Sequence, residues 1–571
     1  MIIQYEENFM DTIRKRRNID LLFLCFLAVL ALGLLWRCRY GFASNDEAFY
    51  LTIPYRLLQG DALLTEEWHL SQLSGLLLTP AVWIFTTLTG GTEGMLLFMR
   101  YLCVITQTAA ALFLYNRLKA FSRLGAAAAS LSFVLFIPLS ICALSYNSMG
   151  ILFLTLSQVI LITGKSYLPA GLCFAAAVLC CPYLLLVYAA YLLIVLGTLV
   201  WSKLRKAAVH PALSVAGALW FTAGAAIAAL FFLLFVLSRS TVSDILPCLE
   251  LMMNDPEHLT YSMIFKLREY WNCILYATNQ TPRLYACLAA AALVCLLDWK
   301  RQSHRAFHSC IIGGIIFALM VSHYQGSHSL NYIMWPVNLW VPFLLLLLSD
   351  RKSAYPIFTL LWLPGIAYSF CMNLASNNIF YAISSGASVA TAATLVMIGM
   401  YLRELRQSEA AVWQKILPIG ILCLTLAYQI TTESYLRYQN IYWGTALNTQ
   451  TEQISEGVQK GLYVTPEYKE GYTWDLEMLK TVDSFHGEQV LYLTETTWYY
   501  LQGQGKNAAY SAWLSGVSQY TLDQLEAYYA INPQKLPDVV YTMDTDIAAK
   551  FCELFGYRIA DETYGLILLP L

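Results

Sequence analysis

Charged side chains are scarce in this sequence. Only 13% of its 571 residues are Asp, Glu, Lys or Arg, whereas 58% are hydrophobic and the mean hydropathy is +0.53. Soluble globular domains carry about a quarter charged residues, so this shortage excludes an ordinary soluble protein and indicates a polytopic membrane protein. The net charge is −2 and no basic stripe is present, which gives no reason to expect a nucleic acid partner.

Motifs for metals and phosphates are also missing. The 15 cysteines include no CxxC pair with metal-ligand spacing, so we expect neither a zinc site nor a disulfide framework. Most of them lie inside apolar runs, where cysteine behaves as a small hydrophobic residue. These are Cys103, Cys142, Cys173, Cys180, Cys181, Cys287, Cys295 and Cys423. The sequence also lacks a glycine-rich phosphate loop, an internal repeat and a low-complexity tract.

The hydrophobic residues gather in long runs. The first, from Ile19 to Trp36, is close to the roughly 20 residues that a helix needs to cross a bilayer. It follows the basic segment 14–17 and precedes no small-residue cleavage site, so we expect a retained first span with its basic end in the cytoplasm. Further runs centre near residues 94–116, 124–144, 149–163, 167–180, 182–201, 213–238, 282–298, 306–322, 332–349, 354–373, 380–401 and 413–430. Together they predict an α-helical polytopic membrane protein with about 13 transmembrane helices.

Basic residues in the connecting loops predict the topology. The loops on one side of the predicted spans all contain Lys or Arg, which is typical of cytoplasmic loops. These loops are 117–123, 165, 203–206, 300–305, 351–352 and 403–406. We therefore expect a multi-pass protein of the cell membrane, with a cytoplasmic N-terminus, outer loops at 37–93 and 239–281, and the C-terminus outside. The run at 71–90 contains Gln72 and Pro80, and we expect it to lie on or dip into the outer face.

The composition changes beyond about residue 435. Apolar runs shrink to the strand-length stretches GLYVT, QVLYLT, DVVYTM and YGLILLPL, which alternate with the helix-like stretches WDLEMLKTVDSF, LDQLEAYYA and IAAKFCELFG. This alternation predicts a small extracytoplasmic α/β domain at 436–571, after a transmembrane domain at 1–435. We assign its many aromatic residues, as in TTWYYLQGQG and WLSGVSQY, to core packing, and no catalytic constellation is visible in it.

Two adjacent carboxylates, Asp46 and Glu47, follow the first span in the stretch FASNDEAFYLTIPYRLLQGD. Ser44 and Glu47 have the S-x-x-E spacing of a capping box, in which Glu47 reaches back to the start of the helix. This interpretation accounts for Glu47 without catalysis. It does not account for Asp46, because the helix dipole favours an acid in the first turn by only about 0.3–1 kcal/mol.

This region resembles the GT-C glycosyltransferases, which include the protein O-mannosyltransferases and the lipid A aminoarabinose transferases. The resemblance rests on the acidic pair and aromatic helix of NDEAFYLTIPYRLLQGD, on SQLSGLLLTPAVWIFTTLTG, and on Arg100 in LLFMRYL. Its sequence-specific part covers about residues 40–117, and the number of spans and the extracytoplasmic C-terminal domain also match the family. The chain has SQLS at 71–74 where many relatives have Lys-Pro-Pro, and Asn331-Tyr332 where they often have Arg-Tyr.

The resemblance implies a glycosyltransferase of the bacterial cell envelope that acts at the extracytoplasmic face of the plasma membrane. Such an enzyme moves a hexosyl or pentosyl group from a polyprenyl-phosphate donor to a glycan, lipid or protein acceptor, with inversion. One carboxylate takes the proton of the attacking hydroxyl, and by motif match that catalytic base is Asp46. No cofactor is implied. Asp46, Glu47, Asp61, Glu66, Glu67 and His69 could supply ligands to a divalent metal, but they have no recognised spacing, so a metal site is unsupported.

The resemblance also implies substrate-binding residues, among which basic or hydrogen-bond-donating groups hold the lipid phosphate as its charge grows. The candidates are Glu47, Tyr50, Arg56, Arg100, His258, Arg283, His323, His328 and Tyr332. Alternatives remain open for several of them: Arg56 as a snorkelling interfacial arginine, Arg100 as the partner of a loop acid, and each histidine as an ordinary polar loop residue.

Two other functional classes are compatible with a polytopic chain. A transporter or lipid-linked sugar flippase is the first alternative, but it would place ionisable residues in the middle of spans and show duplicated halves. A polysaccharide polymerase or ligase is the second, and it would not need the acidic pair and aromatic helix after the first span.

Overall fold

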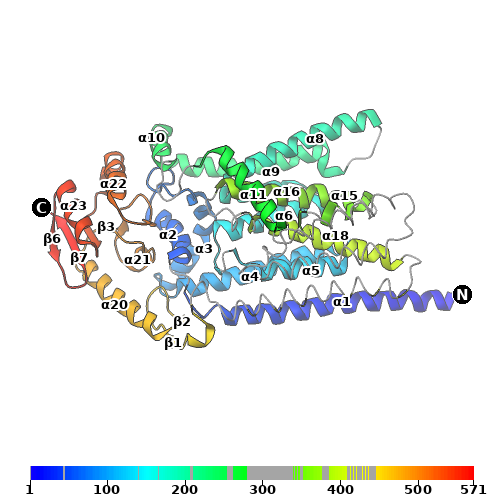
Figure 1. The fold of residues 1–571 in the computed structure, drawn as a ribbon, viewed down its shortest axis with the longest axis horizontal. Coiled ribbons are helices and arrows are strands. Elements are labelled where there is room, and N and C mark those ends of the chain that lie inside the picture. Colours follow the sequence, from blue (N-terminus) through cyan, green and yellow to red (C-terminus); the bar gives the residue numbers. More distant parts are fainter. Residues whose placement is uncertain are drawn as a thin grey trace.

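The computed structural model describes residues 2–42, 45–138, 141–164, 166–205, 210–253, 261–279, 351–375, 385–407 and 445–571, with isolated residues between 338 and 435. Figure 1 shows helices that run side by side along the long axis, with the N-terminus at one end and the C-terminal domain at the other. Several residues named above lie outside the described part: Ser44, His258, Arg283, Cys287, Cys295, His323, His328, Asn331, Tyr332 and Cys423.

The helical bundle contains the helices that the apolar runs predict. They are α1 (Ile2–Arg37), α4 (Met95–Leu118), α5 (Arg123–Leu135), α6 (Tyr146–Thr163), α7 (Leu168–Cys180), α8 (Leu185–Arg205), α9 (Val215–Leu237), α15 (Arg351–Ile357), the π-helical turn η5 (Phe358–Trp362), α16 (Leu363–Ala375) and α18 (Ser388–Gln407). Shorter helices between them are α2 (Asn45–Gln59), α3 (Gly75–Thr89), α10 (Val242–Met253) and α11 (Met263–Asn279).

Eight helical segments in the described part of the chain are long and apolar enough to cross a membrane. They are Arg17–Arg37, Gln72–Thr89, Met95–Leu118, Tyr146–Thr163, Pro182–Leu204, Val215–Leu237, Ala354–Ala375 and Ser388–Gln407. The helical, multi-span character predicted from composition agrees with this finding. The number of about 13 spans stays a prediction, because the runs near 282–298, 306–322, 332–349 and 413–430 fall wholly or mostly outside the described residues.

One apolar run differs from its predicted form. The run at 124–144 is not one span-length helix, since α5 ends at Leu135 and Phe136 is extended. Pro138 explains the end, because proline cannot donate a helical hydrogen bond and disfavours the helical conformation of the residue before it. The run at 71–90 forms the short 3₁₀ turn η1 (Gln72–Ser74) and α3, which together have the length and hydropathy of a candidate span. Its place on or in the outer face stays a prediction.

The C-terminal domain is an α/β unit, as the alternation of short runs predicts. Its five-stranded sheet has the order β4-β3-β5-β7-β6, in which β3 is parallel to β4 and β5, while β7 is antiparallel to β5 and β6. The strands are β3 (Gln489–Tyr492), β4 (Lys506–Asn507), β5 (Val539–Thr542), β6 (Tyr557–Asp561) and β7 (Leu566–Pro570), and the main helices are α20 (Pro466–Asp483), α22 (Gln519–Ile531) and α23 (Thr545–Phe555). The predicted strand GLYVT does not join this sheet. It supplies β2 (Tyr463–Val464), which pairs with β1 (Glu452–Gln453).

The two predicted outer loops meet the C-terminal domain at one end of the bundle (Figure 1). The hydroxyls of Thr65 and Ser240 lie 2.9 Å apart, and Arg239 donates hydrogen bonds to the carbonyls of Leu57 and Asp61. Backbone bonds tie the end of α1 to β2: Gly41 donates to Tyr463 at 2.8 Å. These contacts agree with the prediction that both loops and the C-terminal domain share one face.

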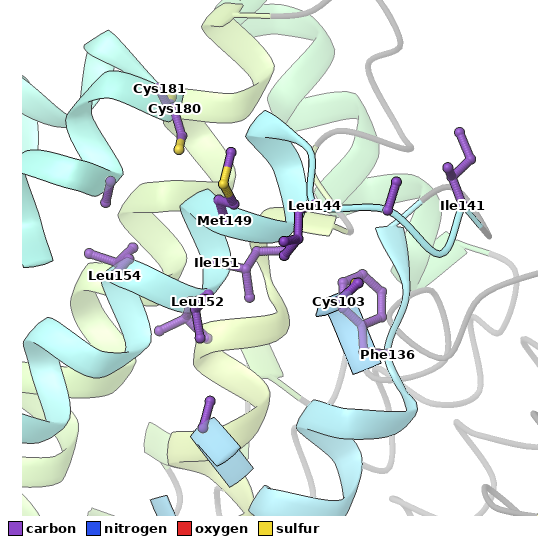
Figure 2. Packing of buried hydrophobic residues seen from close by; sticks show 14 of the residues in the cluster. Cys103, Phe136, Ile141, Leu144, Met149, Ile151, Leu152, Leu154, Cys180 and Cys181 are labelled. Carbon is purple, nitrogen blue, oxygen red and sulfur yellow. The ribbon is translucent and has the colours of Figure 1, made fainter. Parts of the chain in front are cut away.

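Close packing inside the bundle depends on small and apolar residues. Figure 2 shows part of the core, where Cys103, Cys180 and Cys181 lie among residues of 136–154. The cysteines of the described part are free thiols, as expected for residues that act as small apolar groups. Helices α7 and α9 approach closely because Gly171 faces the backbone of Phe221 and Gly224 faces the backbone of Leu168. Small residues that let helix backbones touch are typical of packing between membrane helices.

Replacing Gly224 by Ala should therefore destabilise the bundle. The added methyl group would meet the carbonyl oxygen of Leu168, which cannot move without shifting α7. We expect a loss of about 1–3 kcal/mol, the usual cost of overpacking, seen as a lower thermal midpoint in detergent. Gly197→Ala is the matched control, because its added methyl group meets no atom and alanine favours the helix. Equal midpoints for the two variants would contradict the described packing of α7 on α9.

Candidate active site

Helix α2 carries the two carboxylates in its first turn, as predicted. It begins at Asn45, so Asp46 and Glu47 lie at its N-terminal end, where the helix dipole favours negative charge. Most of the following side chains are buried, and α2 packs against α3 and against the short helix α21 (Tyr499–Gln502) of the C-terminal domain. Gly60 (φ 109°) then reverses the chain in a conformation that side chains rarely adopt.

Glu47 forms a buried ion pair with Arg100 of α4. Their side chains are 2% and 0% exposed, and the guanidinium donates from Nε to Oε1 and from Nη2 to Oε2. Arg100 also donates to the carbonyls of Cys38 and Gly41 at 2.7 and 2.9 Å. A two-point pair of this kind is strong and directional, and it keeps both charges stable away from water.

This ion pair gives Glu47 and Arg100 a structural role. The capping-box interpretation of Glu47 depends on Ser44, which lies outside the described residues, whereas both carboxylate oxygens bond to Arg100. The structure shows the alternative in which Arg100 pairs with a loop acid, Glu47. Contact of Glu47 and Arg100 with a substrate stays a prediction.

Arg56 lies at the other end of α2 in a second buried charge network. Its guanidinium donates from Nε to Asp61 and from Nη1 to Glu67, both at 2.7 Å, and from Nη2 to the carbonyl of Glu66 at 2.8 Å. Asp61 also accepts a hydrogen bond from Lys535 of the C-terminal domain. The Arg56 side chain is only 2% exposed, so it does not snorkel to an interface.

The positive charges of Arg56 and Lys535 face the negative charges of Asp61 and Glu67 in this network. Burial acts to lower the pKa of Arg56, but the carboxylates of Glu67 and Asp61 hold it above its ordinary value. Burial raises the pKa of Glu67, and Arg56 opposes that change. Asp61 and Glu67, which we weighed as metal ligands, therefore face cations instead. Among the residues that the structure describes, no group of three or more His, Cys, Asp or Glu side chains is arranged to hold a metal ion.

Asp46 differs from every other carboxylate of this region. It is half-buried, and within the described residues its carboxylate has one hydrogen bond, from the hydroxyl of Tyr50 at 3.5 Å, and no ion pair. Burial raises the pKa of the Asp46 carboxyl above its ordinary value, and the Tyr50 hydroxyl offsets only part of that rise. A carboxylate with a raised pKa and no ion pair within the described residues is suited to accept a proton.

Aromatic side chains from three parts of the chain surround this end of α2. The Tyr50 ring lies edge-on to Tyr146 of α6, with centroids 5.9 Å apart. Phe49 has edge contacts with His69 at 4.5 Å and with Trp513 of the C-terminal domain at 5.6 Å. The site is therefore bounded by the bundle on one side and by the C-terminal domain on the other.

The structure brings together some of the predicted site residues and separates others. Asp46 and Tyr50 contact each other, Glu47 and Arg100 form the adjacent ion pair, and Arg56 belongs to the separate network at the far end of α2. His258, Arg283, His323, His328 and Tyr332 lie outside the described residues, so their roles stay predictions.

Sequence reasoning missed two residues of this region. Trp513 and Thr497 belong to the C-terminal domain, whose aromatic residues we assigned to its core. Trp513 contacts Phe49 and Thr497 bonds to Asn45, but no local pattern marks either of these long-range contacts.

Removing Arg100 should cost far more stability than removing an exposed arginine nearby. Arg100→Met leaves the Glu47 carboxylate buried without a cation, which costs about 3–5 kcal/mol. The double variant Glu47→Leu/Arg100→Met should recover most of this loss, because apolar groups can replace a buried pair. Arg39→Met, at an exposed arginine of the same loop, is the control and should stay within about 0.5 kcal/mol of the parent. Thermal unfolding in detergent measures all three, and a parent-like Arg100→Met would refute the pairing.

Comparison with known proteins identifies no relative of this chain. No protein-family model, no curated protein and no solved structure matches it.

Proposed function

We propose that this protein is a membrane glycosyltransferase, which moves a sugar from a polyprenyl-phosphate donor to an acceptor at the extracytoplasmic face. One observation carries the proposal. Asp46 has a raised pKa and no cationic partner among the described residues, while the adjacent Glu47 is fully engaged by Arg100. Asp475 has a similar environment in the C-terminal domain, so the proposal depends on where Asp46 lies: in the first turn of α2, beside the engaged Glu47 and at the position that the family resemblance gives to the base.

The proposed reaction is a single displacement with inversion. The acceptor hydroxyl oxygen attacks the anomeric carbon of the sugar while the bond from that carbon to the phosphate oxygen breaks, and the lipid phosphate leaves with the electron pair. Asp46 accepts the proton of the hydroxyl. Its raised pKa brings it closer to the working pH, which is the condition for efficient proton transfer.

The surroundings of Asp46 suit a substrate that arrives from the membrane. The site lies at one end of a bundle with eight span-like segments, so a donor held by its lipid tail could present its head group there. The phosphate contact requires a cation or hydrogen-bond donor. Arg56 and Arg100 already hold carboxylates, so the predicted residues His258, Arg283, His323, His328 and Tyr332 are the candidates.

Replacing Asp46 by Asn tests the proposal directly. Asparagine keeps the shape of the side chain but cannot accept the proton, so transfer should fall by about 10²–10⁴-fold with little change in thermal stability. The assay first screens a panel of polyprenyl-phosphate sugars with the parent protein, and then measures initial rates with the donor that is used.

Asp475→Asn provides a matched control for that experiment. Asp475 is also half-buried, its pKa is also raised by burial, and it also accepts a hydrogen bond from a tyrosine, Tyr499, at 2.8 Å. It lies on α20 of the C-terminal domain and not on α2, so its variant should transfer at the parent rate. If Asp46→Asn transfers as fast as the parent with every donor that the parent uses, Asp46 is not a base and the proposed function loses its support.

The dependence of transfer on pH should report the environment of Asp46. A base must be ionised, so kcat/KM should fall as the pH drops through the raised pKa of Asp46, at a higher pH than for an ordinary aspartate near 3.9. Tyr50→Phe removes the hydrogen bond that holds this pKa down, and the acid limb should then move to still higher pH. An acid limb that keeps its position in Tyr50→Phe would show that another group controls it.

A further inference from the structure

The C-terminal domain holds α2 at both of its ends. At the start of the helix, the hydroxyl of Thr497 donates a hydrogen bond to the carbonyl of Asn45 at 2.7 Å, and Thr497 is completely buried. At the far end, Lys535 bonds to Asp61, which in turn holds Arg56 of α2. These contacts join residues that are 452 and 474 positions apart in the sequence.

The contact at Asn45 lies next to the proposed base. Asn45 is the residue before Asp46, and its carbonyl belongs to the peptide unit that leads into Asp46. A hydrogen bond to that carbonyl therefore restricts the rotation of the backbone from which the Asp46 side chain projects. The neighbouring Phe49 adds a second contact with the domain through the ring of Trp513.

Helix α2 needs support at both ends because it contains Pro54. Proline cannot donate the hydrogen bond that would reach the carbonyl of Tyr50, one turn earlier, and such a gap allows a helix to bend. The half that carries Asp46 is held by Thr497 and Trp513, and the half that carries Arg56 is held through Asp61 by Lys535.

We infer that the C-terminal domain positions the proposed catalytic base, with Thr497 and Lys535 as the positioning residues that fix the two halves of α2. This inference rests on the proposed function of Asp46. It assigns the domain a role in the chemistry without placing any of its side chains on the reacting atoms. A displacement of about 1 Å in a positioned group can lower a rate by about 10²-fold, so a small loss of support is enough to be measured.

Three substitutions at two neighbouring threonines test the first contact. Thr497→Val keeps the shape of the side chain but removes the hydroxyl, and we expect kcat to fall by about 10–10²-fold with KM for the donor nearly unchanged. Thr497→Ser restores the hydroxyl and should restore most of the rate. Thr496→Val is the control, because the half-buried hydroxyl of Thr496 bonds within its own domain. Equal rates for Thr497→Val and the parent would overturn the role of Thr497.

A readout without catalysis separates this inference from the proposed function. In the full chain with Asp46→Cys, the rate of alkylation at position 46 by N-ethylmaleimide is followed by peptide mass spectrometry. Adding Thr497→Val should change this rate and its pH dependence several-fold, whereas adding Thr496→Val should not. If the alkylation rate changes while Asp46→Asn still transfers sugar, the positioning is correct and the proposed function is wrong. An unchanged alkylation rate would overturn the positioning itself.

Lys535→Met tests the second contact by the same readouts. The variant leaves Asp61 with Arg56 alone, so the C-terminal half of α2 loses its link to the domain. We expect kcat to fall in the same direction as in Thr497→Val. Lys480→Met is the matched control, because Lys480 is an exposed lysine of the same domain that pairs with exposed Glu477. Identical kcat and alkylation rates in the two lysine variants would show that Lys535 only stabilises the domain.

Discussion

The ion pair between Glu47 and Arg100 determines the geometry of this end of the molecule. It joins the first turn of α2 to α4, and through the carbonyls of Cys38 and Gly41 it also joins the end of α1. Successive residues on a helix point about 100° apart. Once Glu47 is directed at Arg100, Asp46 is therefore turned away from that cation. The pair thus holds the helix in place and keeps the neighbouring carboxylate free of a cation among the described residues.

The region around α2 contains carboxylates in two different states. Glu47, Asp61 and Glu67 are buried and bonded to arginine or lysine, so they contribute to the position of the chain. Asp46 is half-buried and carries only a long hydrogen bond from a phenol. Perturbed pKa values are frequent at functional sites, and in Asp46 the perturbation occurs beside the ion-paired Glu47. The difference between Asp46 and its neighbours is the basis for treating this region as a site.

Local patterns in the sequence predicted individual strands and helix ends, which depend mainly on neighbouring residues. Strand-length apolar runs such as QVLYLT and DVVYTM became β3 and β5, and the acidic pair opens α2 as expected. The strands β4 and β6 were missed, because KN is too short and YRIAD is too exposed to give an apolar signal. Pro138 marks the end of α5 in the sequence, but the run at 124–144 is hydrophobic throughout, so hydropathy alone predicted a helix that continues past it.

Pairings between distant residues could not be predicted in the same way. Glu47 fits a capping box by spacing, but its partner Arg100 is 53 residues away. Arg56 resembles an interfacial arginine until Lys535, Asp61 and Glu67 are brought around it by the fold. No periodicity in a single sequence encodes such contacts, so the candidate base was predictable by motif whereas the framework that supports it was not.

The position of β7 has a consequence for the biogenesis of the site. This strand, at Leu566–Pro570, lies between β5 and β6 in the interior of the sheet. A chain is made from its N-terminus, and domains generally fold as units as they emerge. The bundle helices and α2 are therefore synthesised long before the sheet that contacts α2 can close. A ribosome that stops short of residue 566 would release a chain whose Asp46 lacks its finished surroundings, so the complete site can form only after β7 has been made.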